Sequence, residues 1–159
     1  MILDIKKSDQ VETVFLDSAV EKINVEENAN VLIIDLENSS KIEINVNDNA
    51  KVTFCSLHKN SEEIEKRGNV HKDAELNWID LIIGENIKLN LQTTLQKVGA
   101  TTKKYQAYLG NKQNVEINSD VIHADSHTTS LMKAKGVLAG KSKIDYTGKI
   151  IIPKNSSGC

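Results

Sequence analysis

The sequence predicts an all-β fold in which short strands wind into a solenoid. Apolar residues alternate with other residues, the alternating runs recur about every ten residues, and turn formers separate the runs. A two-residue period indicates a strand with one buried face. The alternating residues are Leu32, Ile34 and Leu36 in the first run, Ile42, Ile44 and Val46 in the second, and Val52, Phe54 and Ser56 in the third.

The segments around these runs favour turns. Asn28-Ala29-Asn30, Asn38-Ser39-Ser40 and Asn47-Asp48-Asn49 are rich in Asn, Asp and Ser, whose side chains bond nearby backbone. None contains the Asn-Gly or Asp-Gly pair of a tight hairpin. The runs also share one phase, so Leu32 and Val52 are expected at equivalent positions. A solenoid is therefore favoured over a meander or sandwich, which can share the spacing.

Strands are expected to continue to the C-terminus without a helix between them. Tyr105, Ala107 and Leu109 line one strand, and Trp78, in phase with Leu76, is expected in the core. Residues 60–66 are polar and predict a loop or one short helical turn. The other expected strands cover residues 75–83, 87–91, 115–117, 130–133 and 149–152.

Composition limits the classes of partner. The chain has 159 residues, a length that suggests one domain. Its 20 basic and 22 acidic residues give a net charge of −2, which does not predict a basic surface for nucleic acid or membrane. No apolar run approaches the roughly 20 residues of a membrane-spanning helix. The N-terminus does not resemble a signal peptide, and two cysteines fit a reducing compartment. We therefore expect a cytoplasmic protein.

Two stretches resemble the core domain of SufB and SufD, scaffolds of iron–sulfur cluster assembly in the SUF system. The first contains Lys66-Arg67-Gly68, the run from Asp73 to Asp80, and Ile83-Gly84. The second and stronger one contains the elements Val121-Ile122-His123, Ser126-His127-Thr128-Thr129-Ser130, Lys135-Gly136-Val137-Leu138-Ala139-Gly140 and Tyr146-Thr147-Gly148-Lys149-Ile150. The resemblance covers roughly residues 30–159 and is slightly closer to SufD.

This resemblance implies a right-handed parallel β-helix, a single-stranded solenoid, over residues 27–159, preceded by an N-terminal strand segment over residues 1–26. It implies a non-enzymatic scaffold that works with a SufC-type ATPase and a SufB or SufD partner around a transient iron–sulfur cluster. Family members continue past the position of Cys159, and their usual C-terminal part has no counterpart here. The alternative is therefore a structural interaction module without cluster chemistry.

Four residues are candidate metal ligands: Cys55, His58, His123 and His127. Thiolates and imidazoles bind iron or zinc. Cys55 and His58 lie three apart, however, so on a regular strand they would point to opposite faces. The alternative to a ligand role is that Cys55 packs in the core as a small apolar residue. His123 and His127 flank a turn in which Asp125 could orient one ring for metal binding. The alternative is that the rings stabilise the loop by hydrogen bonding.

Other chemistry has less support. Cys159 is expected to be exposed, as a thiol able to bind metal or form an intermolecular disulfide. Gly136 to Ser142 falls one residue short of a phosphate-binding loop and is predicted as strand and turn, with Lys135-Gly136 at the turn. A carbohydrate-active β-helix would need an exposed aromatic stripe or acidic cluster. We expect no catalysis, and self-association through edge strands near Ile150.

Overall fold

The computed structural model describes all residues except 9, 37–38, 60–62 and 112–113. The described residues form thirteen strands and no helix, so they contain no helix able to cross a membrane. The odd-numbered strands are β1 (Ile2–Ile5), β3 (Lys22–Val25), β5 (Lys41–Val46), β7 (Glu63–Val70), β9 (Ile87–Leu95), β11 (Asn114–His123) and β13 (Lys143–Ile151). The even-numbered strands are β2 (Glu12–Leu16), β4 (Asn30–Asp35), β6 (Lys51–His58), β8 (Glu75–Ile82), β10 (Thr101–Asn111) and β12 (Thr129–Ala139).

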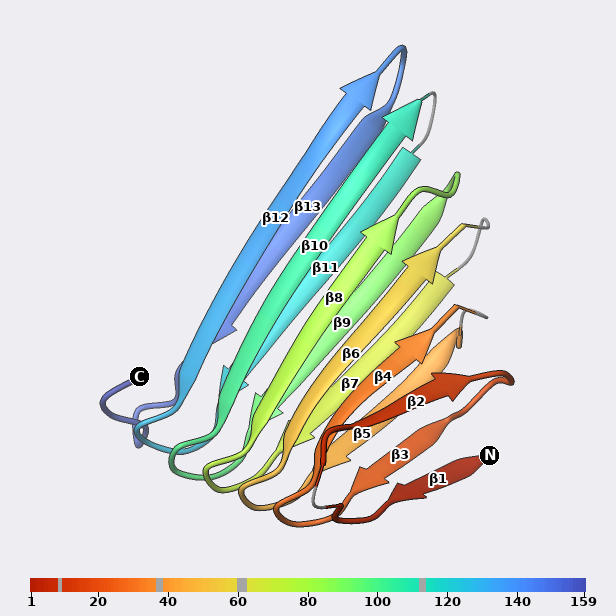
Figure 1. The fold of residues 1–159 in the computed structure, drawn as a ribbon. Coiled ribbons are helices and arrows are strands. Elements are labelled where there is room, and N and C mark those ends of the chain that lie inside the picture. The colour runs from red at the N-terminus through yellow and green to blue at the C-terminus, as the bar shows by residue number, and fades with distance from the viewer. Residues whose placement is uncertain (9, 37–38, 60–62, 112–113) are drawn as a thin grey trace.

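The strands build a β-solenoid with two facing sheets (Figure 1). The odd-numbered sheet has the order β1-β3-β5-β7-β9-β11-β13, and the even-numbered sheet has the order β12-β10-β8-β6-β4-β2. Every neighbouring pair is parallel, because the chain crosses from one sheet to the other and back before it adds the next strand. The solenoid fold predicted from the sequence is confirmed.

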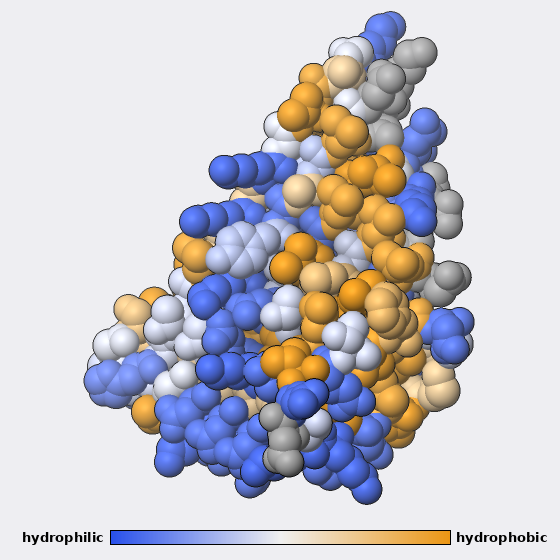
Figure 2. Space-filling view, in the orientation of Figure 1, coloured by the Kyte–Doolittle hydropathy of each residue, from blue (hydrophilic) through white to orange (hydrophobic). Residues whose placement is uncertain are grey.

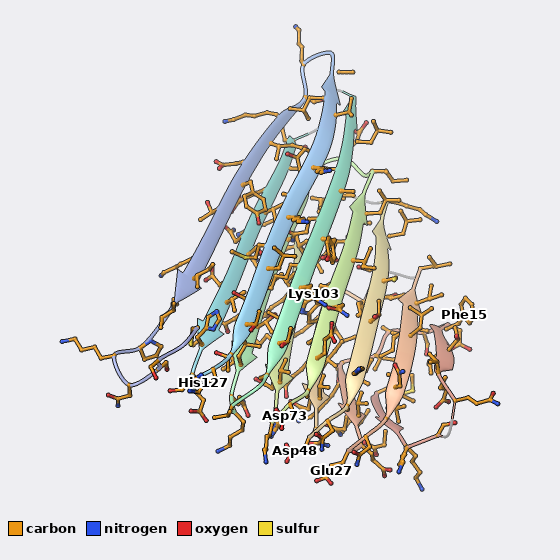
Figure 3. All side chains as sticks on the ribbon, turned by 60° about the vertical axis from the view of Figure 1, so that its left-hand side comes forward. Phe15, Glu27, Asp48, Asp73, Lys103 and His127 are labelled. Atoms are coloured by element: carbon orange, nitrogen blue, oxygen red, sulfur yellow. The ribbon has the colours of Figure 1, made fainter. Side chains whose placement is uncertain are left out.

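Turns stack at the end of the solenoid where odd-numbered strands lead into even-numbered ones. Figure 3 shows Glu27, Asp48, Asp73 and His127 lying at this end. Each of these turns has a residue of positive φ followed by a small buried residue, which begins the next coil. The positive-φ residues are Asn28, Asn49, Asp73, Gly99 and His127. Asn and Asp tolerate this conformation better than most residues. The turns predicted at Asn28 and Asn49 are therefore confirmed.

The core fills the space between the sheets with Val, Ile and Leu, as expected from the low aromatic content. Its largest members, Phe54 on β6 and Trp78 on β8, pack edge to face with ring centroids 5.4 Å apart. Trp78 also donates to Thr93 Oγ1 at 3.1 Å. Gly68 on β7 leaves room for it, since a Cβ there would lie 3.1 Å from Trp78 and 2.5 Å from Leu76. The prediction that Trp78 is in the core is confirmed.

The outer face of the odd-numbered sheet is polar. An amide ladder runs across four strands: Asn24 donates to Asp4 at 2.8 Å, Asn45 to Asn24 at 3.0 Å, and Asn69 to Asn45 at 2.8 Å. Ion pairs such as Lys88 with Glu63 at 3.1 Å lie on the same face. Cross-strand amide and charge pairs stabilise neighbouring strands while keeping their face compatible with water.

Local predictions are wrong on β4, β7 and β12. On β4 the buried apolar residues are Val31 and Ile33, whereas Leu32 and Ile34 face outward, because both phases of this strand are apolar. Residues 63–66, predicted as loop or helical turn, belong to β7, and the rest of that segment falls outside the described residues, as does Asn38. Residues 136–142 are strand and turn as predicted, but Gly136 lies within β12 and the turn is at Gly140 and Lys141. The Tyr108 ring fills the side-chain position of Gly136, since a Cβ there would lie 1.7 Å from Tyr108 Cε2.

Candidate functional site

Polar side chains gather inside the solenoid where β6, β7 and β8 face one another. Lys66 reaches across from β7 and donates to Asp80 Oδ1 at 2.7 Å and to Ser56 Oγ at 2.5 Å. Ser56 also donates to Asp80 Oδ1 at 2.8 Å, and His58 Nε2 lies 3.2 Å from the same oxygen. All four side chains are buried, so this is an ionic cluster in the core and not a surface site.

The Asp80 carboxyl of the cluster is held in its charged form. Burial alone would raise the pKa of the Asp80 carboxyl, but the Lys66 charge and the His58 hydrogen bond outweigh it, so this pKa lies far below its usual value. The Lys66 ammonium also lies 5.0 Å from the Phe54 ring centroid and 5.9 Å from that of Trp78. Cation–π contacts of this kind stabilise a desolvated cation.

A second buried cation lies in the next coil. Lys104 on β10 occupies the position beside Trp78 on β8, and its Nζ donates to the carbonyls of Asp120 at 2.7 Å and Leu91 at 3.1 Å. Burial lowers the pKa of Lys104 to about 7, although Asp80 and Asp120 oppose this shift. Lys104 is thus a core amine near its midpoint of protonation at neutral pH.

The polar inward side of β10 reverses the expected pattern of that strand. Thr102, Lys104 and Gln106 are buried, whereas Tyr105 and Leu109 are exposed on the outer face. Asp80 and Gln106 are register partners on adjacent strands, so the polar interior extends from the cluster into this coil.

Cys55 and His58 lie on the same strand but on opposite faces. His58 joins the buried cluster, whereas Cys55 is half-buried on the outer face of the even-numbered sheet. Burial raises the pKa of the Cys55 thiol, with a further contribution from Asp80, so the thiolate form is disfavoured. The strand contains no bulge that would bring these two candidate ligands together, as the three-residue spacing led us to expect.

His123 ends β11 and lies beneath the last of the stacked turns. Its Nδ1 is 2.7 Å from Thr128 Oγ1 and its Nε2 is 2.9 Å from Ser130 Oγ, and burial lowers the pKa of the ring although a backbone hydrogen bond with Thr128 opposes this shift. His127 is exposed in the turn itself. Exposed Cys159 contacts Thr128, with Sγ 3.4 Å from Oγ1. Thr128 therefore connects His123 to the thiol.

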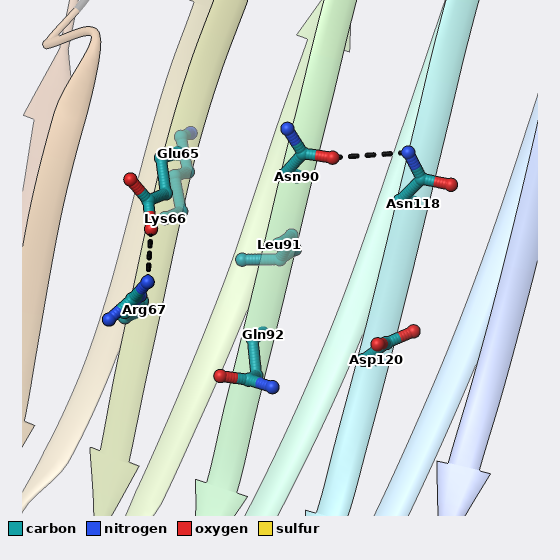
Figure 4. Close-up of a pocket in the computed structure, with 8 residues that line it drawn as sticks. All are labelled: Glu65, Lys66, Arg67, Asn90, Leu91, Gln92, Asn118 and Asp120. Carbon is teal, nitrogen blue, oxygen red and sulfur yellow. Dashed lines mark hydrogen bonds and ion pairs between the residues drawn. The ribbon is translucent and has the colours of Figure 1, made fainter.

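The polar depression on the outer face of the odd-numbered sheet spans β7, β9 and β11 and holds about 200 Å³ (Figure 4). Glu65 pairs with Arg67 along β7, and Asn118 donates to Asn90 at 3.1 Å. Its side chains thus bond mainly to one another. Across the described ranges no three His, Cys, Asp or Glu side chains lie close enough together to hold a metal ion.

Residues 17–159 match the family model described as "SUF system FeS cluster assembly, SufBD core domain". The chain belongs to the SufBD core domain family. Neither the search of curated proteins nor the search of solved structures gave a match. Membership in the SufBD family places the chain in FeS cluster assembly by the SUF system. The match does not distinguish SufB from SufD, so the closer likeness to SufD stays a prediction.

The sequence did not reveal the most connected residues of this SufBD domain. Lys66 and Asp80 lie in the stretches that resemble the family, but neither they nor Lys104 belong to a pattern that predicts a buried charge. The place of Lys104 beside Trp78 is known only from the register of β8 and β10, because the phase of one strand does not fix the phase of the next. The roles of Cys55, His58, His123 and His127 as ligands stay predictions.

Proposed function

We propose that this SufBD chain is a non-catalytic scaffold subunit that holds partner proteins while an iron–sulfur cluster, its cargo, is assembled. The family match over residues 17–159 is the observation that carries this proposal. The proposed partners are a SufC-type ATPase and a SufB- or SufD-type subunit in the cytoplasm, with this chain as the SufD counterpart. A second copy of the chain is the alternative partner.

The last coil supports docking of another subunit. β12 and β13 each have a single strand neighbour, so the backbone groups of their outer edges are open to a further strand. Leu138 on β12 and Ile150 on β13 occupy inward phases, yet they are 49% and 51% exposed. A partner strand on either edge would cover these apolar side chains and satisfy the open backbone groups.

The positions of the candidate ligands favour a shared cluster. Cys55 faces outward on β6, whereas His123 and Cys159 lie near the last stacked turn. Iron–sulfur clusters are held mainly by cysteine thiolates. We therefore propose that this chain contributes single ligands, from Cys55, His123 or His127, to a cluster completed by a partner subunit.

Light scattering on size-exclusion fractions tests the docking. The wild-type chain is mixed with a SufB-type subunit and a SufC-type ATPase, and compared with the variant Leu138→Lys/Ile150→Lys. We expect a stoichiometric complex with the wild type and at least tenfold weaker assembly with this variant. Phe15→Lys, an exposed site on β2 at the other end of the solenoid, is the matched control. No complex with the wild type, or equal loss in the control, would contradict the proposal.

A further inference from the structure

The two outer faces of the solenoid differ in character. The odd-numbered sheet carries the amide ladder and ion pairs described above. The even-numbered sheet shows a continuous apolar band toward the upper ends of its strands, above a hydrophilic base (Figure 2). A large contiguous apolar patch with a polar rim marks an interaction surface more often than free surface.

The part of this band nearest the C-terminal coil is formed by three neighbouring strands, β8, β10 and β12, whose register aligns their apolar side chains. Ile79 pairs with Tyr105, Leu81 with Ala107, and Leu109 with Val137. Leu109 and Val137 are 57% and 64% exposed. We call the surface the even-face patch, and its residues are Ile79, Leu81, Tyr105, Ala107, Leu109 and Val137.

The even-face patch contains a depression of about 640 Å³ over Ala107. Leu81, Leu109 and Val137 rise around this small side chain, and Lys135 closes the side toward β12. A hollow of this kind receives a protruding apolar side chain, as anchor pockets at protein interfaces do.

The charged side chains at the outward strand positions of the patch are lysines. Lys133 and Lys135 face outward on β12, and neither has an ion pair with any residue that the structure describes. Lys103, farther down the same face, already pairs with Glu75 at 2.7 Å. From Ile79 onward, the outward positions of β8, β10 and β12 contain no carboxylate. A partner with acidic groups would therefore complement this rim.

We propose that the even-face patch docks an amphipathic helix of a partner protein, with acidic residues at the end that lies over β12. Strands lie about 4.8 Å apart and a helical turn rises 5.4 Å, so a helix laid across the strands places roughly one apolar side chain over each. Helix apolar stripes and sheet faces are natural packing partners. This surface is distinct from the edges used in the proposed scaffold role.

A second copy is a poorer occupant. A two-fold pairing brings the same surface to itself. That surface offers two unpaired lysines and no carboxylate, so such a pair would leave the rim uncompensated.

Fluorescence anisotropy with a designed probe tests the proposal. The probe is a fluorescein-labelled, lactam-stapled helix of about 15 residues with a leucine stripe and three terminal Glu residues, and its counterpart carries Lys in place of Glu. We expect the Glu probe to bind the wild-type chain at least tenfold more tightly than the Lys probe. Lys133→Glu/Lys135→Glu should invert this preference, and Leu109→Asn/Val137→Asn should abolish binding of both probes.

Lys143→Glu/Lys149→Glu is the matched control, because it makes the same charge change on the outer face of β13. Circular dichroism checks that each variant keeps its strands. Equal binding of both probes by wild type, or an unchanged preference in Lys133→Glu/Lys135→Glu, would overturn the proposal. A dimer in sedimentation that only Leu109→Asn/Val137→Asn disrupts, without probe binding, would assign the patch to a second copy. These results are independent of the edge docking tested with Leu138→Lys/Ile150→Lys, so the two proposals can fail separately.

Discussion

Lys104 gives the core a dependence on pH. The unfolded chain holds the proton of this side chain up to about pH 10.5, whereas the folded chain releases it near pH 7. The unfolded state therefore binds more protons between these values, and stability rises with pH across this window. Each pKa unit corresponds to about 1.4 kcal/mol, so the contribution amounts to several kcal/mol.

Replacing Lys104 with methionine should remove this dependence. Lys104→Met keeps a long side chain but carries no titrating amine. Its free energy of unfolding should therefore exceed that of wild type most below pH 7, and the excess should shrink as the pH approaches 10. Urea unfolding followed by circular dichroism at several pH values measures the difference in free energy of unfolding. A constant difference between the two proteins across this range would show that the folded chain does not perturb Lys104.

The burial of a single residue could be predicted only where an apolar side chain also stands at an inward position of its strand. Trp78 is apolar and in phase with Leu76, so its place in the core followed from the sequence. Lys66 has the same inward position on its strand, but a charged residue in a polar segment indicates solvent unless its partner is known. Asp80, the partner, is 14 residues away and on the other sheet. No local pattern connects the two.

At the level of elements, the Lys66–Asp80 contact joins the two sheets across the core. Removing one partner leaves a buried charge without compensation, which costs about 3–5 kcal/mol. Lys66→Met should therefore destabilise the chain by this amount. Lys66→Met/Asp80→Leu, which removes both charges, should recover most of the loss in urea unfolding. A double variant no more stable than Lys66→Met would contradict this account of the cluster.

Strand positions followed from the sequence better than strand faces did. The period of two and the turn residues located β5, β6 and β8 closely. The face of β4 was wrong because Val31 to Ile34 are all apolar, so either phase fits a core. On β10 the apolar phase lies outside, because the polar interior takes Thr102, Lys104 and Gln106, and Leu109 belongs to an exposed patch. Alternation gives two faces but does not say which is covered.

At the level of the whole molecule, the stacked coils place different chemistry on different surfaces. The even-numbered sheet has an apolar patch (Figure 2), the odd-numbered sheet is polar outside, and the interior carries buried charges. Each surface arises from register, because residues one coil apart stack although they lie some 20 to 28 positions apart in sequence. The family resemblance could indicate the solenoid, but the sequence alone could not assign these surfaces.

Anaerobic reconstitution with ferrous iron and sulfide tests the scaffold role most directly. The chain in complex with the proposed SufB-type partner is compared with the same complex carrying Cys55→Ala/His123→Ala, and absorbance and iron content are measured. The scaffold role predicts a cluster in the wild-type complex and a clear loss of iron in the variant. If the wild-type complex retains no iron, the scaffold role is contradicted and the chain acts as a structural interaction module. If the variant retains as much iron as wild type, Cys55 and His123 supply no ligand.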